Sequence, residues 1–354
     1  MTTNQPEFIA IGDMVIDAFI RLGEKSKARV IKNENGTKEI ALPFGDKIEF
    51  DFAEEIAAVG NSANAAVSAA RLGLSSGLVV NIGGDNDGKK CLVQMEKDGV
   101  SAEFVKVHQD KKTNYHYVLW YQDERTILIK HEEYEYELPN IGKPKCIYLS
   151  SLSENALPFH TNIANYLEAH PEIKFIFQPG TFQMKWGTDS LKRIYQRTDV
   201  FFCNTEEAER ILKLEAKPKT PERLKELLDG LRALGPKLPV ITDGPGGAYT
   251  YSSAASTTPG EIGKLNYDQV IHLDIYPDIA PPYERTGAGD AFASTFSVAY
   301  TLGHDVSTCL KWGSINSMNV CQHVGAQAGL LTHEKIEEYL KNSPAGWDVK
   351  VVVG

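Results

Sequence analysis

The sequence predicts an α/β protein with a mostly parallel central sheet and helices on both of its faces. Short, strongly apolar runs alternate with amphipathic stretches along most of the 354 residues. This alternation is typical of parallel strands that are joined by crossover helices. With 42% hydrophobic and 24% charged residues, the chain also has ample material for a large core.

Six apolar runs are predicted to be buried strands, and several of them end in Gly, Asn or Ser. They are FIAIG (8–12), LVVNIG (78–83), CIYLSSL (146–152), KFIFQPG (174–180), VFFCN (200–204) and LPVITDG (238–244). Helices are predicted between them, at SANAAVSAARLG (62–73), DGKKCLVQMEKDG (87–99) and TPERLKELLDGLRAL (220–234).

Two segments break the alternation and predict a small inserted sheet of antiparallel strands. Residues 21–52 have alternating arms around an Asn35–Gly36 turn, and residues 113–133 form a hairpin pattern around residues 122–124. We assign residues 1–20, 53–112 and 134–354 to the α/β domain, and the two segments to a β lid. The alternative to a lid is a structural flap or a dimer contact.

The charge balance and the chain start narrow the class of protein. A formal net charge of -10 disfavours binding to nucleic acid or to an anionic membrane. The first residues lack the basic flank and long apolar run of a signal peptide, and no apolar stretch approaches a membrane span. Five dispersed cysteines without a C-x-x-C pair indicate reduced thiols. We therefore expect a cytoplasmic protein.

Several short patterns resemble known ligand loops but are incomplete. GGDNDGKK (83–90) has Lys90 where a phosphate loop has Ser or Thr, and Asp85 and Asp87 would repel phosphate. An acidic turn that opens a helix is the better interpretation. GPGGAY and GAGDAF lack the third glycine of a dinucleotide fingerprint, and H-E-x-x-H and G-x-S-x-G motifs are absent.

The stretch ERTGAGDAFA (284–293) predicts an anion site. Three small residues, Gly287, Ala288 and Gly289, precede an evidently helical run that has Asp290 in its first turn. A helix N-terminus carries unpaired N–H groups and a partial positive charge, and glycines let an anion approach them closely. Asp290 would then be either a base beside the anion or simply an acid that stabilises the helix dipole.

An ordered set of motifs decides between these interpretations, because the chain resembles the PfkB, or ribokinase-like, family of carbohydrate and nucleoside kinases. The resemblance extends over about Phe8 to Tyr339. The motifs that carry it are GDMVIDAF, VGNSANAAVSAARLG, NIGGDNDGKKCLVQMEKDGV, NTEEAE, ITDGPGGAY, RTGAGDAF and HVGAQAG. It implies a three-layer αβα sandwich with a small β-sheet lid.

The resemblance also implies a role for each matching residue. Asp290 would be the general base, and the amides around Gly287, Ala288 and Gly289 would form the anion hole for the transferring phosphoryl group. The substrate would be held by Asp13, Asp17, Gly60, Asn61 and Asn64; ATP would be bound by Asn204, Thr242, Gly244 and Gly247; and Mg²⁺ would be organised by Glu207 together with Asn204.

Some positions differ from the family pattern, mostly on the substrate side. Glu284 and Arg285 replace the usual Asp and Thr where many members bind a monovalent cation, which leaves potassium activation open. Ser153, followed by Glu154, replaces a Glu that often contacts sugar hydroxyls, and Gln178–Thr181 replaces an Asp-Pro-Asn type of turn. Val59 stands where a Gly is common.

The resemblance implies direct transfer of the γ-phosphoryl group of Mg-ATP to a hydroxyl of a small sugar. The alternative is a nucleoside acceptor, since aromatic side chains at 115–121 could stack on a base, and a catalytically silent binding protein is a third reading. A phosphosugar is disfavoured because Asp13 and Asp17 lie on the substrate side without an obvious basic pair. The family also implies a homodimer formed through the lid.

Overall fold

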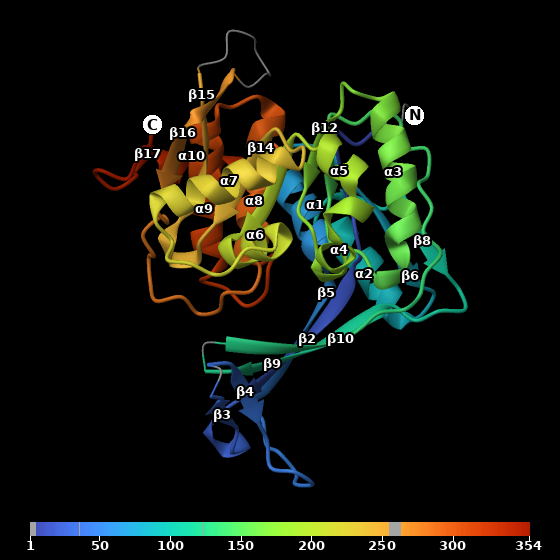
Figure 1. The fold of residues 1–354 in the computed structure, drawn as a ribbon. Helices are drawn as coiled ribbons and strands as arrows, with labels where there is room; N and C mark the ends of the chain where they lie inside the picture. Colours follow the sequence, from blue (N-terminus) through green and yellow to red (C-terminus); the bar gives the residue numbers. More distant parts are fainter. Residues whose placement is uncertain (1–4, 35, 123, 255–262) are drawn as a thin grey trace.

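The structure is a computed structural model that describes residues 5–34, 36–122, 124–254 and 263–354 (Figure 1). A large α/β body carries a smaller β-sheet at one side, below the body in the view of Figure 1. Within the described residues, no helix has the length and apolar character needed to cross a membrane.

The main sheet of the body is mostly parallel. Its strands lie in the order β17 (Lys350–Val353), β16 (Leu265–Leu273), β15 (Ala248–Ser253), β14 (Leu238–Thr242), β13 (Val200–Asn204), β12 (Lys174–Phe177), β11 (Cys146–Leu149), β1 (Phe8–Ile11), β6 (Ser76–Gly83) and β7 (Val100–Ser101), while β8 (Val105–His108) also pairs with β6. From β14 to β7 all pairs are parallel, and only β14 to β17 pair antiparallel. All six predicted strands are present.

The central strands are apolar because both of their faces are covered. Every residue of β1, β6 and β11 is buried, as expected for a parallel sheet between two helical layers. One layer contains α1 (Asn61–Arg71), α2 (Asn86–Lys97), α8 (Ala288–Leu302), α9 (Val306–Val320) and α10 (His333–Lys341). The other contains α3 (Leu157–Ala169), α4 (Thr181–Ser190), α5 (Lys192–Arg197), α6 (Thr205–Leu212) and α7 (Pro221–Ala233). The predicted three-layer fold is confirmed.

The small sheet contains four strands in the order β10 (Glu124–Lys130), β9 (Asn114–Tyr121), β2 (Val15–Leu22) and β5 (Phe52–Val59). A separate hairpin of β3 (Arg29–Lys32) and β4 (Lys38–Ala41) lies farther from the body (Figure 1). We call the four-stranded sheet and this hairpin the lid. Short 3₁₀ turns at Glu24–Ser26, Glu154–Ala156 and Gly244–Gly246 complete the described elements.

The lid differs from the predicted segments in two respects. Its strands extend beyond residues 21–52 and 113–133, since β2 begins at Val15 and β5 continues to Val59. In addition, β2 and β9 pair parallel, whereas antiparallel strands were expected. The reason is that β2 and β5 run without interruption from the body into the lid, so composition alone does not mark the boundary. Asn35 and residue 123, at the two predicted turns, lie outside the described residues, but the flanking strands do pair as hairpins.

Candidate active site

Two adjoining cavities open at the carboxyl ends of the main-sheet strands, where open α/β sheets usually bind their ligands. The first, of about 500 Å³, lies between the body and the lid, and the second has about 430 Å³. They share Thr242, Arg285 and Gly289 in their walls. A ligand in one cavity can therefore reach a ligand in the other.

The structure brings all the predicted site residues to these cavities. The first cavity is lined by Asp13, Asp17, Gly60, Asn61, Asn64, Asn204, Glu207, Thr242, Gly287, Gly289 and Asp290. The second is lined by Thr242, Gly244, Gly247, Ala288 and Gly289. The predicted substrate residues thus line the first cavity and most of the predicted ATP residues line the second. The exceptions are Thr242, which lines both cavities, and Asn204 at the start of α6, which lines the first.

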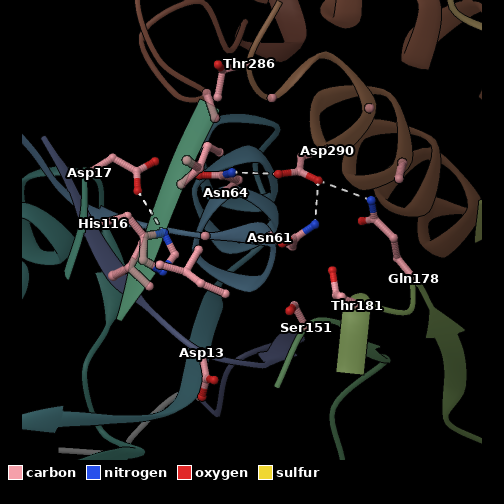
Figure 2. A pocket seen from close by; sticks show the side chains of 18 of the residues that line it. Asp13, Asp17, Asn61, Asn64, His116, Ser151, Gln178, Thr181, Thr286 and Asp290 are labelled. Carbon is pink, nitrogen blue, oxygen red and sulfur yellow. Dashed lines mark hydrogen bonds and ion pairs between the residues drawn. The ribbon is translucent and has the colours of Figure 1, made fainter. Parts of the chain in front are cut away.

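Three side-chain amides hold the carboxylate of Asp290 at the junction of the cavities (Figure 2). Asn61 donates to Oδ1 over 2.9 Å, Asn64 donates to Oδ2 over 2.8 Å, and Gln178 donates to Oδ1 over 3.1 Å. The amides are themselves fixed, because Gln327 donates to Asn64 Oδ1 and the Tyr148 hydroxyl donates to Gln178 Oε1. The carboxylate therefore has one orientation toward the cavity.

Burial raises the pKa of Asp290 above its ordinary value. The hydrogen bonds from Asn64, Gln178 and Asn61 oppose this effect, and so does the positive charge of Arg125. A carboxylate with a raised pKa is a better proton acceptor than a free one, and the surrounding donors stabilise its ionised form.

Backbone geometry at the start of α8 makes the predicted anion site possible. Gly287 is the N-cap residue and has φ of 80°, a left-handed conformation that favours glycine. A Cβ atom there would lie 2.2 Å from the Cβ of Ala326. A Cβ atom on Gly289, in contrast, would meet nothing within 4 Å. The space beside Gly289 belongs to both cavities and is free to take a ligand.

The second cavity is mostly apolar apart from its glycine loop. Phe292, Met318 and Leu273 line it together with Gly244 and Gly247. Gly247 has φ of 80°, and a Cβ atom there would lie 2.1 Å from the carbonyl oxygen of Leu273. Such a shape, with apolar walls beside an anion site, suits a flat heterocycle that carries phosphates.

Asn204 and Glu207 form a capping box at the start of α6. The Asn204 side chain accepts a hydrogen bond from the Glu207 N–H (2.8 Å), and Glu207 Oε2 accepts one from the Asn204 N–H (2.9 Å). Burial raises the pKa of Glu207. The described residues contain no group of three or more acidic, His or Cys side chains that could hold a metal alone. One carboxylate fits Mg²⁺, which usually keeps water and phosphate oxygens as its other ligands.

The two substrate-side acids have different surroundings. Asp13 is 5% exposed and accepts hydrogen bonds from the hydroxyls of Tyr136 (2.8 Å) and Ser153 (2.5 Å). Asp17 is turned toward the cavity beside His116 (Figure 2). Glu154, next to Ser153, pairs instead with Lys185 at the surface. Glu154 therefore does not take the place of the Glu that Ser153 replaces.

Sequence reasoning did not assign several side chains of the first cavity. Gln178 follows β12 directly, so its position at a strand end was a usable signal. His116 belongs to the aromatic set that the sequence offered as a contact for a base, whereas the sequence context of Arg125 and His131 gave no comparable signal. Of the aromatic set at 115–121, only His116 lines the cavity; Trp120, for example, packs under Arg21 instead.

Glu284 ties three segments together beside the anion site. Its Oε1 accepts from the N–H of Thr286 (2.6 Å), and its Oε2 accepts from the N–H of Gly325 (3.2 Å). The Thr286 hydroxyl also donates to Oε1. Arg125 from the lid places Nη1 3.9 Å from the same oxygen, while its buried Nε has no hydrogen-bond partner among the described residues.

Comparison with known families decides which family the chain belongs to. The profile of the pfkB family carbohydrate kinases matches residues 52–333. The chain belongs to the pfkB family. The resemblance read from the ordered motifs is thereby confirmed, and this pfkB-family chain is a phosphotransferase that uses an alcohol group as acceptor.

Individual relatives of this pfkB-family chain act on different acceptors. It is 26% identical over 278 residues to a nucleoside kinase of Methanothermobacter thermautotrophicus, covering 77% of this chain and 80% of the relative. It is also 26% identical over 290 residues to a ribokinase of Bacillus subtilis, covering 79% and 87%. The structure of Arabidopsis thaliana ribokinase complexed with ribose and ATP matches with a TM-score of 0.73 at 18% identity, covering 95% and 99%, which confirms the fold.

Proposed function

We propose that this protein transfers the γ-phosphoryl group of ATP to a hydroxyl of a small, uncharged sugar, with Asp290 as general base. The observation that carries the proposal is the position of the Asp290 carboxylate. Three amides hold it in the first cavity, one residue from Gly289, which lines both cavities. A base at this junction can take the proton from the hydroxyl of an acceptor in the first cavity. The hydroxyl oxygen of the acceptor then attacks a phosphoryl group that is bound on the side of the second cavity.

In this proposal the backbone amides at the start of α8 bind the transferring phosphoryl group. Their N–H groups and the helix dipole offset the negative charge that develops during transfer. Glu207 and Asn204 would hold the Mg²⁺ ion, which supplies further charge neutralisation at the phosphates. The apolar second cavity would take the adenine base of ATP.

The charges of the first cavity favour an acceptor without a phosphate. Its wall contains four carboxylates, from Asp13, Asp17, Glu207 and Asp290, against the two guanidinium groups of Arg125 and Arg285. Arg125 is already close to Glu284. Carboxylates and amides together bind hydroxyl groups well, because a carboxylate accepts from a hydroxyl and an amide both accepts and donates.

A nucleoside acceptor is the second candidate, and one feature favours it. Ile127, Ile129 and Phe182 form an apolar part of the same cavity wall, which could cover the flat face of a base. The similarity to a nucleoside kinase of Methanothermobacter thermautotrophicus supports this candidate as much as the similarity to a ribokinase supports a sugar, since both relatives are 26% identical to this chain.

A coupled ADP-release assay with Mg-ATP and a panel of free sugars and nucleosides tests the proposal. We expect turnover with a free sugar, and about 10²–10⁴-fold lower kcat for Asp290→Asn. The matched control is Asp305→Asn, because Asp305 caps the neighbouring α9 and Asn is an equally good N-cap. Turnover confined to nucleosides would select the second candidate. Near-normal kcat in Asp290→Asn would refute the base assignment.

We further propose that two copies associate through their lids. Tyr117 and Leu128 are paired neighbours on β9 and β10 and are both exposed, as are Val30 and Ile31 on the hairpin. Exposed apolar side chains gathered on one small part of a protein, here the lid, are typical of an interface. Light scattering should give the mass of a dimer for the wild type and of a monomer for Leu128→Arg. Val93→Arg, at an exposed position on α2, should stay dimeric. A monomeric wild type would rule the interface out.

A further inference from the structure

Arg285 is the charged member of the three residues that line both cavities. The other two are Thr242 and Gly289. Arg285 directly precedes the turn that opens α8, and its carbonyl oxygen accepts a hydrogen bond from the Ala288 N–H (3.5 Å). The residue therefore lies where the cavities adjoin, beside the proposed anion site, and no role has so far been assigned to its side chain.

The guanidinium group of Arg285 has no protein partner among the residues that the structure describes, where it forms neither a hydrogen bond nor an ion pair. Glu284, its neighbour in the chain, is 4% exposed and accepts instead from the N–H groups of Thr286 and Gly325. Asp278, in the wall of the second cavity, forms no ion pair with it either. The five N–H donors of the guanidinium are thus free to bind a ligand.

Electrostatic effects show that the charge of Arg285 acts on the second cavity. Burial and the charge of Asp278 raise the pKa of the Cys321 thiol, and the charge of Arg285 opposes this rise. Cys321 lines the second cavity. The cation therefore lies on the side where the nucleotide would bind, although Arg285 belongs to the wall of the first cavity as well.

We propose that Arg285 binds the γ-phosphoryl group of ATP at the junction of the cavities and keeps hold of it during transfer. The inference rests on the proposed kinase function. In that reaction the acceptor oxygen bonds to the γ-phosphorus and the acceptor proton goes to Asp290. The bond from the γ-phosphorus to the bridging oxygen breaks, and ADP leaves with that electron pair. The three outer oxygens stay negatively charged throughout, and a guanidinium group can pair with two of them at once.

The surroundings of Arg285 favour the γ-phosphate over a phosphate on the acceptor. Four carboxylates line the first cavity and would repel a phosphorylated acceptor. Gly289, whose amide belongs to the proposed anion hole, shares both cavity walls with Arg285. The amide and the guanidinium would therefore approach the same group, one from the backbone and the other from a side chain.

Nucleotide binding without an acceptor tests the contact. In calorimetric titrations with Mg²⁺, Arg285→Gln should bind the β,γ-imido analogue of ATP about tenfold more weakly than the wild type, with unchanged affinity for ADP. Arg29→Gln, at an exposed position of the hairpin outside both cavities, is the control and should match the wild type. An equal loss for both nucleotides would mean a stack on the base or a contact with the other phosphates, and would overturn the proposal. Unchanged affinity for both would refute it.

Turnover tests whether the contact persists during transfer. Arg285→Gln should lower kcat about 10²–10³-fold and leave the KM for the acceptor close to that of the wild type. Arg285→Lys should keep more of the rate, and millimolar guanidinium ion should restore part of it in Arg285→Ala. A KM that rises only for phosphorylated acceptors would assign the charge to the acceptor and overturn the proposal. If no acceptor is turned over, the kinase proposal fails, whereas the nucleotide titration still decides the role of Arg285.

Discussion

At the scale of single residues, the important feature of Gly289 is that it has no side chain. A Cβ atom there would meet no protein atom within 4 Å, so the protein itself does not require glycine. The position faces both cavities, where the phosphates would lie. Packing therefore does not explain the glycine, whereas the proposed anion site would.

Substitution of Gly289 should accordingly separate stability from activity. Gly289→Ala should leave the free energy of unfolding unchanged or raise it by up to about 1 kcal/mol, since alanine is the better helix former. Gly289→Val should abolish turnover by filling the anion site while the protein stays folded. Denaturant unfolding and the ADP-release assay measure the two effects, and full activity in Gly289→Val would contradict the anion site.

The raised pKa of Asp290 makes a prediction about pH. Since the base must be ionised, kcat should fall as the pH decreases through a pKa that lies above the ordinary 3.8. The effect of pH on stability has the opposite sign. Above the raised pKa the carboxylate is ionised in the folded protein, which lowers the free energy of unfolding, whereas below the ordinary carboxyl range it is protonated in both states and has no such cost. A kcat that stays constant down to the ordinary carboxyl range would contradict the assignment.

At the scale of secondary-structure elements, the starts of helices carry much of the site. α8 would supply the anion site and the base in its first turn, and α6 supplies the capping box of Asn204 and Glu207. Local rules of helix capping thus place these groups at the cavity. The groups at these helix starts would therefore both stabilise a helix and bind the ligand.

Glu207→Gln separates the two roles of the capping box. Gln at this position also completes a capping box, so the thermal stability should hardly change. The variant loses the negative charge, and it should need about 10–100-fold more Mg²⁺ for half-maximal rate. A Mg²⁺ titration of the rate measures this, with Glu206→Gln on the same helix turn as the control. An unchanged Mg²⁺ requirement would exclude Glu207 as the metal residue.

At the scale of the whole molecule, the lid completes the first cavity. Alternate residues of β10, namely Arg125, Ile127 and Ile129, face into it. Arg125 also approaches Glu284, whose carboxylate binds the N–H groups of Thr286 and Gly325. We therefore expect the lid, the proposed anion site and the proposed base to be electrostatically linked.

Arg125→Met tests this link. The charge of Arg125 lowers the pKa of Asp290, so its removal should move the acid limb of the kcat profile to higher pH. Arg125→Lys, which keeps the charge, should show a smaller shift. Arg29→Met, in the hairpin and outside both cavities, should show none. An acid limb that stays in place in Arg125→Met would disprove the coupling.

Much of the fold and part of the site could be predicted because they follow from local sequence. The six buried strands are continuous apolar runs, and such runs are recognisable without knowledge of their neighbours. Glycines before a helix, and an Asn followed three residues later by a Glu, indicate helix starts for the same reason. The lid boundaries were less accurate, since β2 and β5 belong to the lid and to the body at once.

The sequence by itself determined the α/β architecture through short-range periodicity and the family through its ordered motifs. Helix capping likewise placed the groups at the starts of α8 and α6. Only the tertiary structure decided which distant side chains meet. Gln178 contacts Asp290 across 112 residues of chain, and His116 of the lid contacts both Asp17 and His131. Such contacts depend on how the lid packs over the body, and no local pattern encodes that arrangement.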